Sequence, residues 1–329
     1  MLLNLMIMQE KILKKTNHTL IVIAGPTAIG KTSLSIQLAS HFSCPVISAD
    51  SRQFFKEMSI GTAKPSSDEM KDITHYFVGS HSITDNYNVG RYEKEALEVL
   101  AQLFKSHETV IMVGGSGLYI DAVCAGFDEL PEADQNVRDR INTLYKTQGI
   151  EGLQKLLEQL DPVYFDQVDK QNPQRLSRAL EVCLITGHPY SLLRKASKKK
   201  RDFNLIKIGL NMPRPLLYER INQRVDQMME QGLVEEVKSL QEYKHLNALQ
   251  TVGYKELFDF LPELTASEQE PDHYKQLLEK ATELIKQNTR RFAKRQLTWF
   301  RRDEQLKWFE PHEIGPILTY IAENRINGS

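Results

Sequence analysis

Residues 25–32 read Gly-Pro-Thr-Ala-Ile-Gly-Lys-Thr and match the pattern G-x-x-x-x-G-K-[S/T] at every fixed position. A leucine and three β-branched residues at 20–23 precede this motif, as expected of a buried parallel strand. Apolar residues at helical spacing follow it, so the motif lies between a strand and a helix. This context predicts a phosphate-binding loop in an α/β fold, with a parallel-sheet core of the P-loop NTPase type.

Each residue type in the motif has a chemical task. The glycines let the backbone curl so that its N–H groups point at an anion, and the helix that follows adds the positive end of its dipole. The lysine can reach terminal phosphate oxygens, and the last hydroxyl can ligate Mg²⁺, the expected cofactor, so the metal ligand is Thr32. The predicted phosphate-binding residues are Gly25, Pro26, Thr27, Ala28, Ile29, Gly30, Lys31 and Thr32. The motif does not indicate which nucleotide or other phosphorylated compound binds.

Composition limits the class of protein. The chain has 329 residues, enough for a large core with a smaller lobe. Its three cysteines form no C-x-x-C pair, which argues against a zinc knuckle or a disulfide framework and fits a reducing cytosol. No apolar run reaches membrane-spanning length, and residues 1–18 lack the pattern of a signal peptide. We therefore expect a cytoplasmic protein with an N-terminal extension and no membrane partner.

Polar side chains follow the next predicted strand, residues 45–48. Asp50, Ser51, Arg52 and Gln53 come directly after it. Ligands of open α/β sheets lie beyond the carboxyl ends of the strands, so this cluster is expected to face the phosphate loop. Two interpretations remain open, because Asp50 or Ser51 would also suit the cap of a following helix. A third strand ends in the glycine-rich turn 114–117, which allows close backbone approach to a ligand.

The alternation of strands and helices stops after residue 129. Residues 136–160 and 173–186 are predicted helices, and no segment between them resembles a buried strand. This predicts a helical lobe at 130–202, inserted between a first core part at 1–129 and a second at 203–329. Arg175 and Arg178 are three apart, on one face of the second of these helices.

The predicted helix at 273–300 is dense in arginine and lysine. Phe292 and Trp299, seven residues apart, are expected to share a face that packs on the core. The remaining cations, which project elsewhere, suit phosphates and unstacked bases and are Arg291, Lys294, Arg295 and Arg302. A solvated basic face is the alternative. Because these charges cluster in a chain whose net charge is −1, RNA binding is favoured over a solvated face.

These motifs, taken in order, resemble those of the tRNA dimethylallyltransferases, over about residues 20–310. The matching segments are the phosphate loop, residues 50–53, 60–65, 114–119, 175–182, 253–254 and 289–301. Phe55 stands where the family usually has tyrosine and Ser116 where it usually has threonine. No Cys/His zinc module follows Phe309, so the bacterial form is the one resembled.

The resemblance implies transfer of a dimethylallyl group from dimethylallyl diphosphate to the N6 amine of the adenosine 3′-adjacent to the anticodon, by a monomer that holds the anticodon stem-loop. It implies that Asp50 is the catalytic base, that Thr27 donates to the bridging oxygen and that Arg224 reaches the diphosphate from the opposite side. The implied tRNA-binding residues are Asp50, Ser51, Arg52, Gln53, Ser116, Arg138, Gln174, Arg175, Leu176, Ser177, Arg178, Gln250, Thr251, Val252, Gly253, Tyr254 and Lys255.

Three other functions account for parts of the sequence. A small-molecule P-loop kinase explains the phosphate loop but not the basic helix or the inserted lobe. An isopentenyltransferase acting on free adenine nucleotides needs no RNA-holding lobe. A non-catalytic RNA-binding protein would not need Lys31, Thr32 and Asp50 intact.

Overall fold

The computed structural model describes residues 18–128, 130–194 and 199–327. The described chain divides into two compact units, with divisions after Cys124 and after Lys200. Unit 1 combines the segments on either side, and unit 2 is the segment between them. The sequence placed the lobe boundaries a few residues later, at 130 and 202. The expected N-terminal extension lies outside the described residues except for His18.

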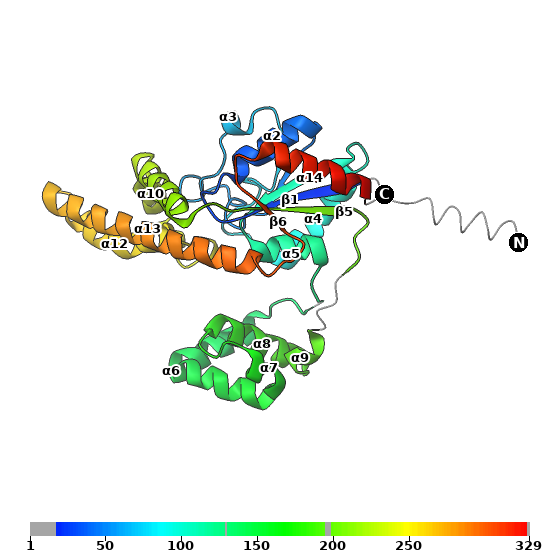
Figure 1. Ribbon diagram of the computed structural model, residues 1–329. Coiled ribbons are helices and arrows are strands. Elements are labelled where there is room, and N and C mark those ends of the chain that lie inside the picture. The colour runs from blue at the N-terminus through cyan, green and yellow to red at the C-terminus, as the bar shows by residue number, and fades with distance from the viewer. Residues whose placement is uncertain (1–17, 129, 195–198, 328–329) are drawn as a thin grey trace, which may run out of the picture. The chain divides into compact units, whose positions relative to one another are not determined.

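Unit 1 is built on a six-stranded sheet in the order β3-β2-β4-β1-β5-β6 (Figure 1). Every strand pair is parallel, which confirms the predicted α/β class. The central strand pairs in register with both neighbours, Thr19 opposite Thr109 on one side and opposite Asn204 on the other. The strands are β1 (Thr19–Ala24), β2 (Val46–Ser48), β3 (His75–Tyr76), β4 (Thr109–Gly114), β5 (Asn204–Leu210) and β6 (Lys307–Phe309).

Helices cover both faces of this sheet. The helices before the inserted segment are α2 (Lys31–Phe42), α3 (Ser67–Met70), α4 (Val89–Leu103) and α5 (Gly117–Ala125). Those after it are α10 (Arg214–Glu230), α11 (Leu233–Ser239), α12 (Tyr254–Ala266), α13 (Pro271–Phe300) and α14 (Ile314–Asn327), with short 3₁₀ turns η1 (Gln241–Tyr243) and η2 (Asn247–Leu249).

The burial of β1 explains its continuous apolar sequence. Leu20 and Val22 belong to the apolar cluster on the face of α4 and α5. Ile21 and Ile23 belong to the cluster on the face of α2 and α14 (Figure 1). Because both faces are covered, neither side of the strand can be polar. This fixes β1 firmly and so positions the loop that leaves its carboxyl end.

Unit 2 is helical, as predicted. It contains α6 (Gln135–Leu160), α7 (Pro162–Gln167), α8 (Pro173–Thr186) and α9 (Tyr190–Leu193), around a core that includes Leu153 and Leu180. Gly149 has φ 66° and interrupts α6. The buried Asp161 accepts hydrogen bonds from Tyr164 N–H at 2.9 Å and from Ser191 N–H at 2.7 Å, so one carboxylate caps α7 and holds α9.

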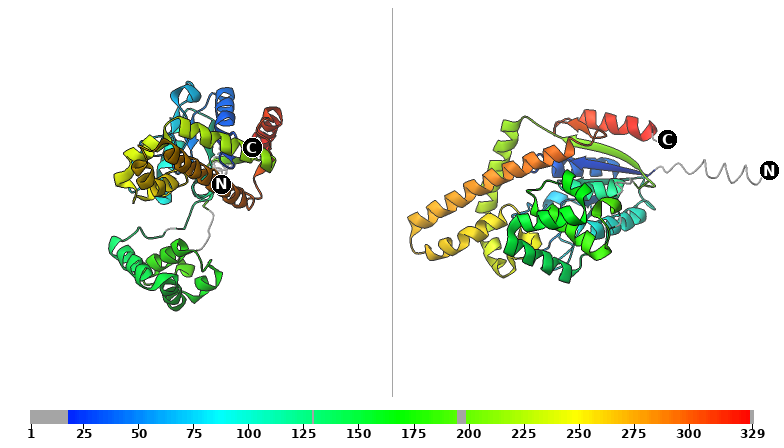
Figure 2. Two further views of the ribbon diagram at one scale, coloured as in Figure 1. Left: turned by 90° about the vertical axis from the view of Figure 1, so that its left-hand side faces the viewer. Right: turned by 90° about the horizontal axis from the view of Figure 1, so that it is seen from below.

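The long helix α13 runs along unit 1 (Figure 2). Trp299 packs against the core and its indole N–H donates to Asp121 Oδ2 at 2.9 Å. Phe292 is 37% exposed, with the Arg295 guanidinium 5.8 Å from its ring centroid. The prediction that both aromatic residues pack on the core is therefore wrong for Phe292. The buried face of this part of α13 is formed by Ala293, Gln296 and Phe300.

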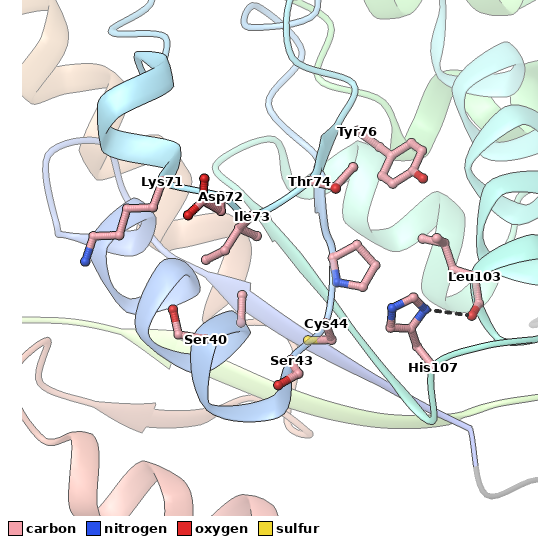
Figure 3. A pocket seen from close by; sticks show the side chains of 12 residues that line it. Ser40, Ser43, Cys44, Lys71, Asp72, Ile73, Thr74, Tyr76, Leu103 and His107 are labelled. Atoms are coloured by element: carbon pink, nitrogen blue, oxygen red, sulfur yellow. Dashed lines mark hydrogen bonds between the residues drawn. The ribbon is translucent and has the colours of Figure 1, made fainter.

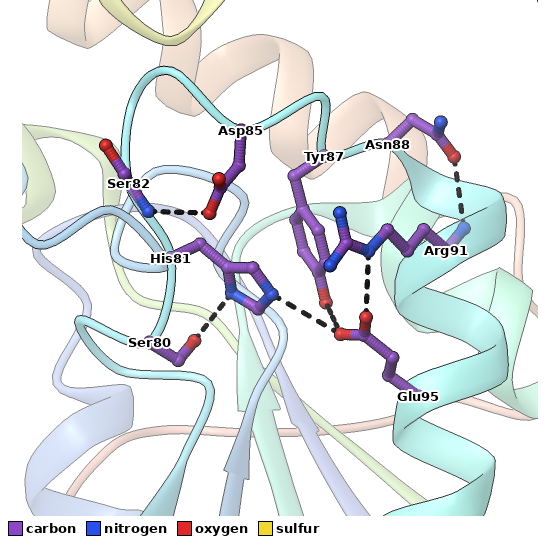
Figure 4. Close-up of polar contacts among 8 residues, drawn as sticks. All are labelled: Ser80, His81, Ser82, Asp85, Tyr87, Asn88, Arg91 and Glu95. Carbon is purple, nitrogen blue, oxygen red and sulfur yellow. Dashed lines mark hydrogen bonds and ion pairs between the residues drawn. The ribbon is translucent and has the colours of Figure 1, made fainter.

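A half-buried carboxylate ties the loop before α4 to that helix (Figure 4). Glu95 accepts hydrogen bonds from Arg91 Nε and from the Tyr87 hydroxyl, both at 2.9 Å. The Nε2 atom of His81 lies 3.4 Å from the same carboxylate, and its ring packs on Tyr87. Burial acts to raise the pKa of Glu95, but these hydrogen bonds and cations outweigh it and lower the pKa overall.

Candidate active site

The phosphate loop has the curled backbone that its sequence predicts. It leaves β1 at Ala24 and enters α2 at Lys31, with Gly30 at φ 105° and Ala28 at φ 61°. A Cβ on Gly25 would lie 2.9 Å from the Leu210 carbonyl oxygen, so β5 leaves room only for glycine there. The Lys31 ammonium donates to the Pro26 carbonyl at 2.7 Å, which folds its side chain back over the loop.

Three charged residues predicted from the sequence influence one another at this loop. Burial lowers the pKa of Lys31 to about 8, the charge of Asp50 acts to raise it, and that of Arg224 acts to lower it further. Burial likewise lowers the pKa of Arg224, and Asp50 opposes that effect too. The structure therefore brings Lys31, Asp50 and Arg224 within electrostatic range of one another, with the carboxylate acting on both cations.

Asp50 follows β2 and caps a turn rather than a helix. Its Oδ1 atom accepts a hydrogen bond from Arg52 N–H at 3.0 Å, and the next helix begins at Ser67 with its own cap, Ser66. The helix-cap interpretation of Asp50 is therefore wrong. Among the residues that the structure describes, no donor is bonded to Oδ2, so one oxygen of the carboxylate remains available.

The residues after Asp50 hold neighbouring segments of unit 1 in place. Ser51 N–H donates to the Ser116 hydroxyl at 2.9 Å, which links the ends of β2 and β4. The Arg52 guanidinium donates to the carbonyls of residues 247 and 248, at 2.9 and 3.0 Å. The Gln53 amide donates to the carbonyls of residues 62 and 63, at 3.2 and 3.1 Å. One guanidinium nitrogen of Arg52 and the amide nitrogen of Gln53 are thus already used inside the protein.

Arginines of α10 approach the phosphate loop from another element. Arg224 lies 3.5 Å from the Thr62 carbonyl, the oxygen that Gln53 also contacts. Arg220, one turn earlier, donates from Nε to the Ala28 carbonyl at 2.9 Å. The i, i+4 spacing of the two arginines is visible in the sequence, but the contact of Arg220 with the loop was not predicted.

Gln296 on α13 joins the two glycine-rich turns, which the sequence analysis missed. Its Oε1 atom accepts from Thr27 N–H at 2.9 Å, and its Nε2 atom donates to the Gly115 carbonyl at 2.8 Å. A Cβ on Gly115 would collide with that amide nitrogen. The sequence offers one signal for this role: Gln296 is a single amide residue on the buried face that also carries Ala293 and Phe300.

Glu236 is a second residue that the sequence analysis missed. Its carboxylate accepts from the backbone N–H groups of residues 59, 60 and 61, at 2.8–3.0 Å, and from the Tyr254 hydroxyl. The Tyr254 side chain is completely buried, which corrects its assignment as an RNA contact. Gly253 is buried too, and its N–H donates to Glu256 at 2.7 Å. Gln250 and Lys255 are exposed, and Thr251 and Val252 are half-buried.

The candidate RNA residues of unit 2 have different surroundings. Arg138 and Arg178 bind the two oxygens of the buried Glu181, at 2.7 and 2.6 Å. Leu176 is completely buried in the core of the unit, which corrects its assignment as an RNA contact. Gln174 and Arg175 are exposed, and Ser177 is half-buried.

A cavity of about 480 Å³ lies at the amino ends of the strands, away from the phosphate loop at their carboxyl ends (Figure 3). It is lined by Pro45, Thr74 and His107, which precede β2, β3 and β4. Burial raises the pKa of Cys44 in its wall to about 12, so that thiol is unreactive at neutral pH. Ligands of parallel sheets bind at the carboxyl ends of the strands, so this cavity is not the active site.

Comparison with known proteins decides the family. The model of the IPPT family, IPP transferase, matches residues 53–303, more than half of the chain. The chain belongs to this family.

Curated relatives agree with this assignment. The tRNA dimethylallyltransferase of Flavobacterium johnsoniae is 51% identical over 93% of this chain and 97% of its own length. The tRNA dimethylallyltransferase 1 of Bacteroides thetaiotaomicron is 48% identical over 92% of this chain and 95% of its own. The chain is thus an enzyme of the transferase class.

Solved structures show the same fold. The tRNA isopentenylpyrophosphate transferase of Bacillus halodurans has a TM-score of 0.68 and 33% identity, covering 94% of this chain and 98% of its own. A eukaryotic dimethylallyltransferase acting on tRNA has a TM-score of 0.72 and 26% identity, covering 94% of this chain and 78% of its own. Within the described part of this transferase, no helix is both long and apolar enough to cross a membrane.

The protein groups at the phosphate loop fit a magnesium ion held together with a bound phosphate group. The described residues contain no cluster of three or more His, Cys, Asp or Glu side chains able to hold a metal. The Thr32 hydroxyl follows Lys31 at the start of α2 and makes no hydrogen bond with another described residue. Mg²⁺ typically takes one or two protein oxygens together with substrate phosphates and water. A single hydroxyl beside a phosphate loop suits that mode.

Proposed function

We propose that this transferase moves the dimethylallyl group of dimethylallyl diphosphate to the N6 amine of the adenosine 3′-adjacent to the anticodon in tRNA. The bond between the allylic carbon and the diphosphate oxygen breaks, and a bond between that carbon and N6 forms. The products are N6-(dimethylallyl)adenosine in the tRNA, diphosphate and a proton. The observation that carries the proposal is that the Asp50 carboxylate, at the end of β2, lies within electrostatic range of the Lys31 and Arg224 cations at the phosphate loop.

The two cations serve the leaving group. Negative charge grows on the diphosphate as the carbon–oxygen bond breaks, and fixed cations in a site of low polarity stabilise that charge. In this proposal Lys31 reaches the diphosphate from the loop and Arg224 reaches it from α10. In this proposal the Thr27 hydroxyl donates to the bridging oxygen. When bound at Thr32, Mg²⁺ supplies further positive charge to the same oxygens.

Asp50 serves the acceptor. An aromatic amine is a weak nucleophile, and its proton must leave as the carbon–nitrogen bond forms. The free oxygen of Asp50 can accept a hydrogen bond from N6, orient the amine and take that proton. The adenine must leave its stack to reach the site, which costs least in a single-stranded loop.

The RNA is held by groups of both units. The RNA contacts that remain after the corrections above are the Asp50–Gln53 turn, Ser116, Gln250, Thr251, Val252, Lys255, Arg138, Gln174, Arg175, Ser177 and Arg178. The exposed Arg175 is the clearest of these, since no ion pair occupies it among the described residues. The proposal takes the enzyme to act as a cytoplasmic monomer.

One experiment separates this function from its rivals. The protein is incubated with dimethylallyl diphosphate labelled in the allyl group and with unmodified tRNA, AMP or ATP in separate reactions. The proposal predicts label in tRNA, released by nuclease digestion as N6-(dimethylallyl)adenosine. Label in AMP or ATP identifies an enzyme acting on free nucleotides. Binding of tRNA without any labelled product contradicts a transferase acting on RNA.

A further inference from the structure

A second cavity of unit 1, about 410 Å³ in volume, lies between the start of α10 and the end of α13. Arg214, Lys294 and Arg301 line it, and none of its lining side chains is a carboxylate. None of its lining residues belongs to the phosphate loop. Leu217, which lines the cavity, belongs to the same apolar cluster as Ile29 of that loop.

The three cations of this cavity are not neutralised by the protein. Arg214 donates to the uncharged Tyr218 hydroxyl at 2.8 Å, and its guanidinium lies 5.2 Å from the Tyr218 ring centroid. No ion pair joins Arg214, Lys294 or Arg301 to a carboxylate within the described chain. A fourth cation, Arg290, has its guanidinium 6.0 Å from the Tyr218 ring centroid and donates to the neutral Asn222 amide oxygen at 2.6 Å.

Unpaired positive charge around one cavity indicates an anion-binding site in this chain, because its net charge is only −1. A solvated lysine or arginine needs no partner, but several around one cavity create a potential that concentrates anions. Met212 and Leu297 add an apolar wall beside them. Charge of this kind next to an apolar wall suits a phosphate group that is attached to a sugar and a base.

We propose that this cavity is a second phosphate-binding site, which takes a phosphate carried by a nucleotide unit. The phosphate has two sources, a strand of the RNA substrate or a free nucleotide. Only the first rests on the proposed function. In the RNA case the site adds affinity outside the reaction centre and orients the strand relative to the phosphate loop.

The test compares two double variants of one helix. Lys294→Gln/Arg301→Gln removes two charges from the cavity, and Lys275→Gln/Lys280→Gln removes two exposed charges near the N-terminal end of α13. The probes are a synthetic RNA hairpin with an anticodon stem-loop sequence and AMP. Hairpin binding is followed by fluorescence anisotropy over a range of salt, and AMP binding by calorimetry. Thermal melts establish that both variants are folded.

A phosphate of the RNA in the cavity predicts that the cavity variant loses hairpin affinity about tenfold at low salt. Its plot of log affinity against log salt becomes less steep by about 0.7–0.9 for one lost phosphate contact. The control variant keeps the wild-type slope. A free nucleotide predicts instead that AMP affinity falls while the hairpin slope is unchanged.

Thr298→Trp tests the cavity itself, because it fills the space and keeps every charge. If the phosphate binds inside the cavity, Thr298→Trp weakens binding of the same probe that the charge-removing cavity variant weakens. The proposal is overturned if neither probe weakens relative to the control, or if Thr298→Trp binds both as the wild type does. All readouts of this test measure binding. If the protein failed to alkylate tRNA, the proposed function would be refuted, but the binding test of the cavity would still be valid.

Discussion

The side-chain oxygen of Gln296 accepts a hydrogen bond of 2.9 Å from the backbone N–H of Thr27, which lies 269 positions earlier in the chain. The amide nitrogen of the same side chain donates to Gly115. One buried amide on α13 therefore sets the distance between the phosphate loop and the turn after β4. Because Thr27 is proposed to contact the diphosphate, Gln296 is a positioning residue for the reaction.

Replacing Gln296 with Met keeps the volume and removes both hydrogen bonds. We expect kcat/KM to fall by roughly 10², the loss typical of a slightly misplaced reacting group, with KM for dimethylallyl diphosphate rising. The free energy of unfolding should fall by about 1–3 kcal/mol, because two buried backbone groups lose their partner. Gln296→Glu keeps the acceptor for Thr27 and should retain more diphosphate affinity. A loss of stability with an unchanged KM would reduce Gln296 to a structural role.

Lys31 predicts how diphosphate binding depends on pH. Its pKa of about 8 in the free protein lies below the usual 10.5 because the group is buried. A bound diphosphate favours the charged amine, so the pKa rises on binding. Below pH 8 the lysine is charged in both states and the affinity is constant. Above pH 8 binding must take up a proton, and the affinity falls by up to tenfold per pH unit.

Calorimetry with dimethylallyl diphosphate between pH 7 and pH 10 measures this dependence. The ligand is fully ionised over most of this range, since the last pKa of a phosphate ester is about 6. Lys31→Arg keeps the charge at every pH in the range and should remove the bend near pH 8. A bend that persists in this variant would assign the titration to another group.

Local sequence predicted the parts of the fold and site that depend on local chemistry. The continuous apolar run of β1 implied a strand buried on both faces, and the glycines and lysine after it implied the loop. The place of Asp50 after a parallel strand favoured the ligand side but left a helix cap open, and its role as base was implied only by the family resemblance. Helical periodicity likewise gave α6, α8 and α13 to within a few residues.

Contacts between distant segments were not predictable in this way. Gln296 and Glu236 act on turns far from them in the chain, and nothing in their own neighbourhoods names those partners. Phe292 shares a face with Trp299 by spacing, but the buried residues of this part of α13 are Ala293, Gln296 and Phe300, so Phe292 lies beside the buried face rather than on it. Tyr254 and Leu176 lie in matching family segments, and only the packing shows that their side chains are buried.

The two arginines of α8 should respond differently to loss of charge. Arg175 is exposed, whereas Arg178 binds the buried Glu181 at 2.6 Å. Arg175→Gln should weaken tRNA binding, flatten its salt dependence and leave the melting temperature unchanged. Arg178→Gln should also lower the free energy of unfolding, by about 1–3 kcal/mol, because Glu181 keeps only Arg138. Filter binding and urea unfolding separate the two effects; equal stability losses would contradict this division.

Glu95 predicts an acid-sensitive contribution to stability. Its pKa is lowered in the folded protein, so the stabilisation is fully present above the unfolded value of 4.5 and is lost as pH falls through the folded pKa. Between pH 7 and pH 3 the wild type should therefore lose more unfolding free energy than Glu95→Gln, which has no charge to titrate. Urea unfolding at both pH values measures the difference. Parallel losses in the two proteins would show that the contacts of Figure 4 contribute no charge-dependent stability.

Asp50→Asn isolates the proposed base. Asparagine keeps the shape and can still accept the Arg52 N–H, so the turn after β2 should survive. It cannot take a proton, so the single-turnover rate with tRNA should fall by roughly 10²–10⁴. Affinity for dimethylallyl diphosphate should stay the same or rise, because a carboxylate beside Lys31 and Arg224 repels that anion. A near-wild-type rate would remove Asp50 from the catalytic residues, and a loss of diphosphate affinity would mean that its role is to position the two cations.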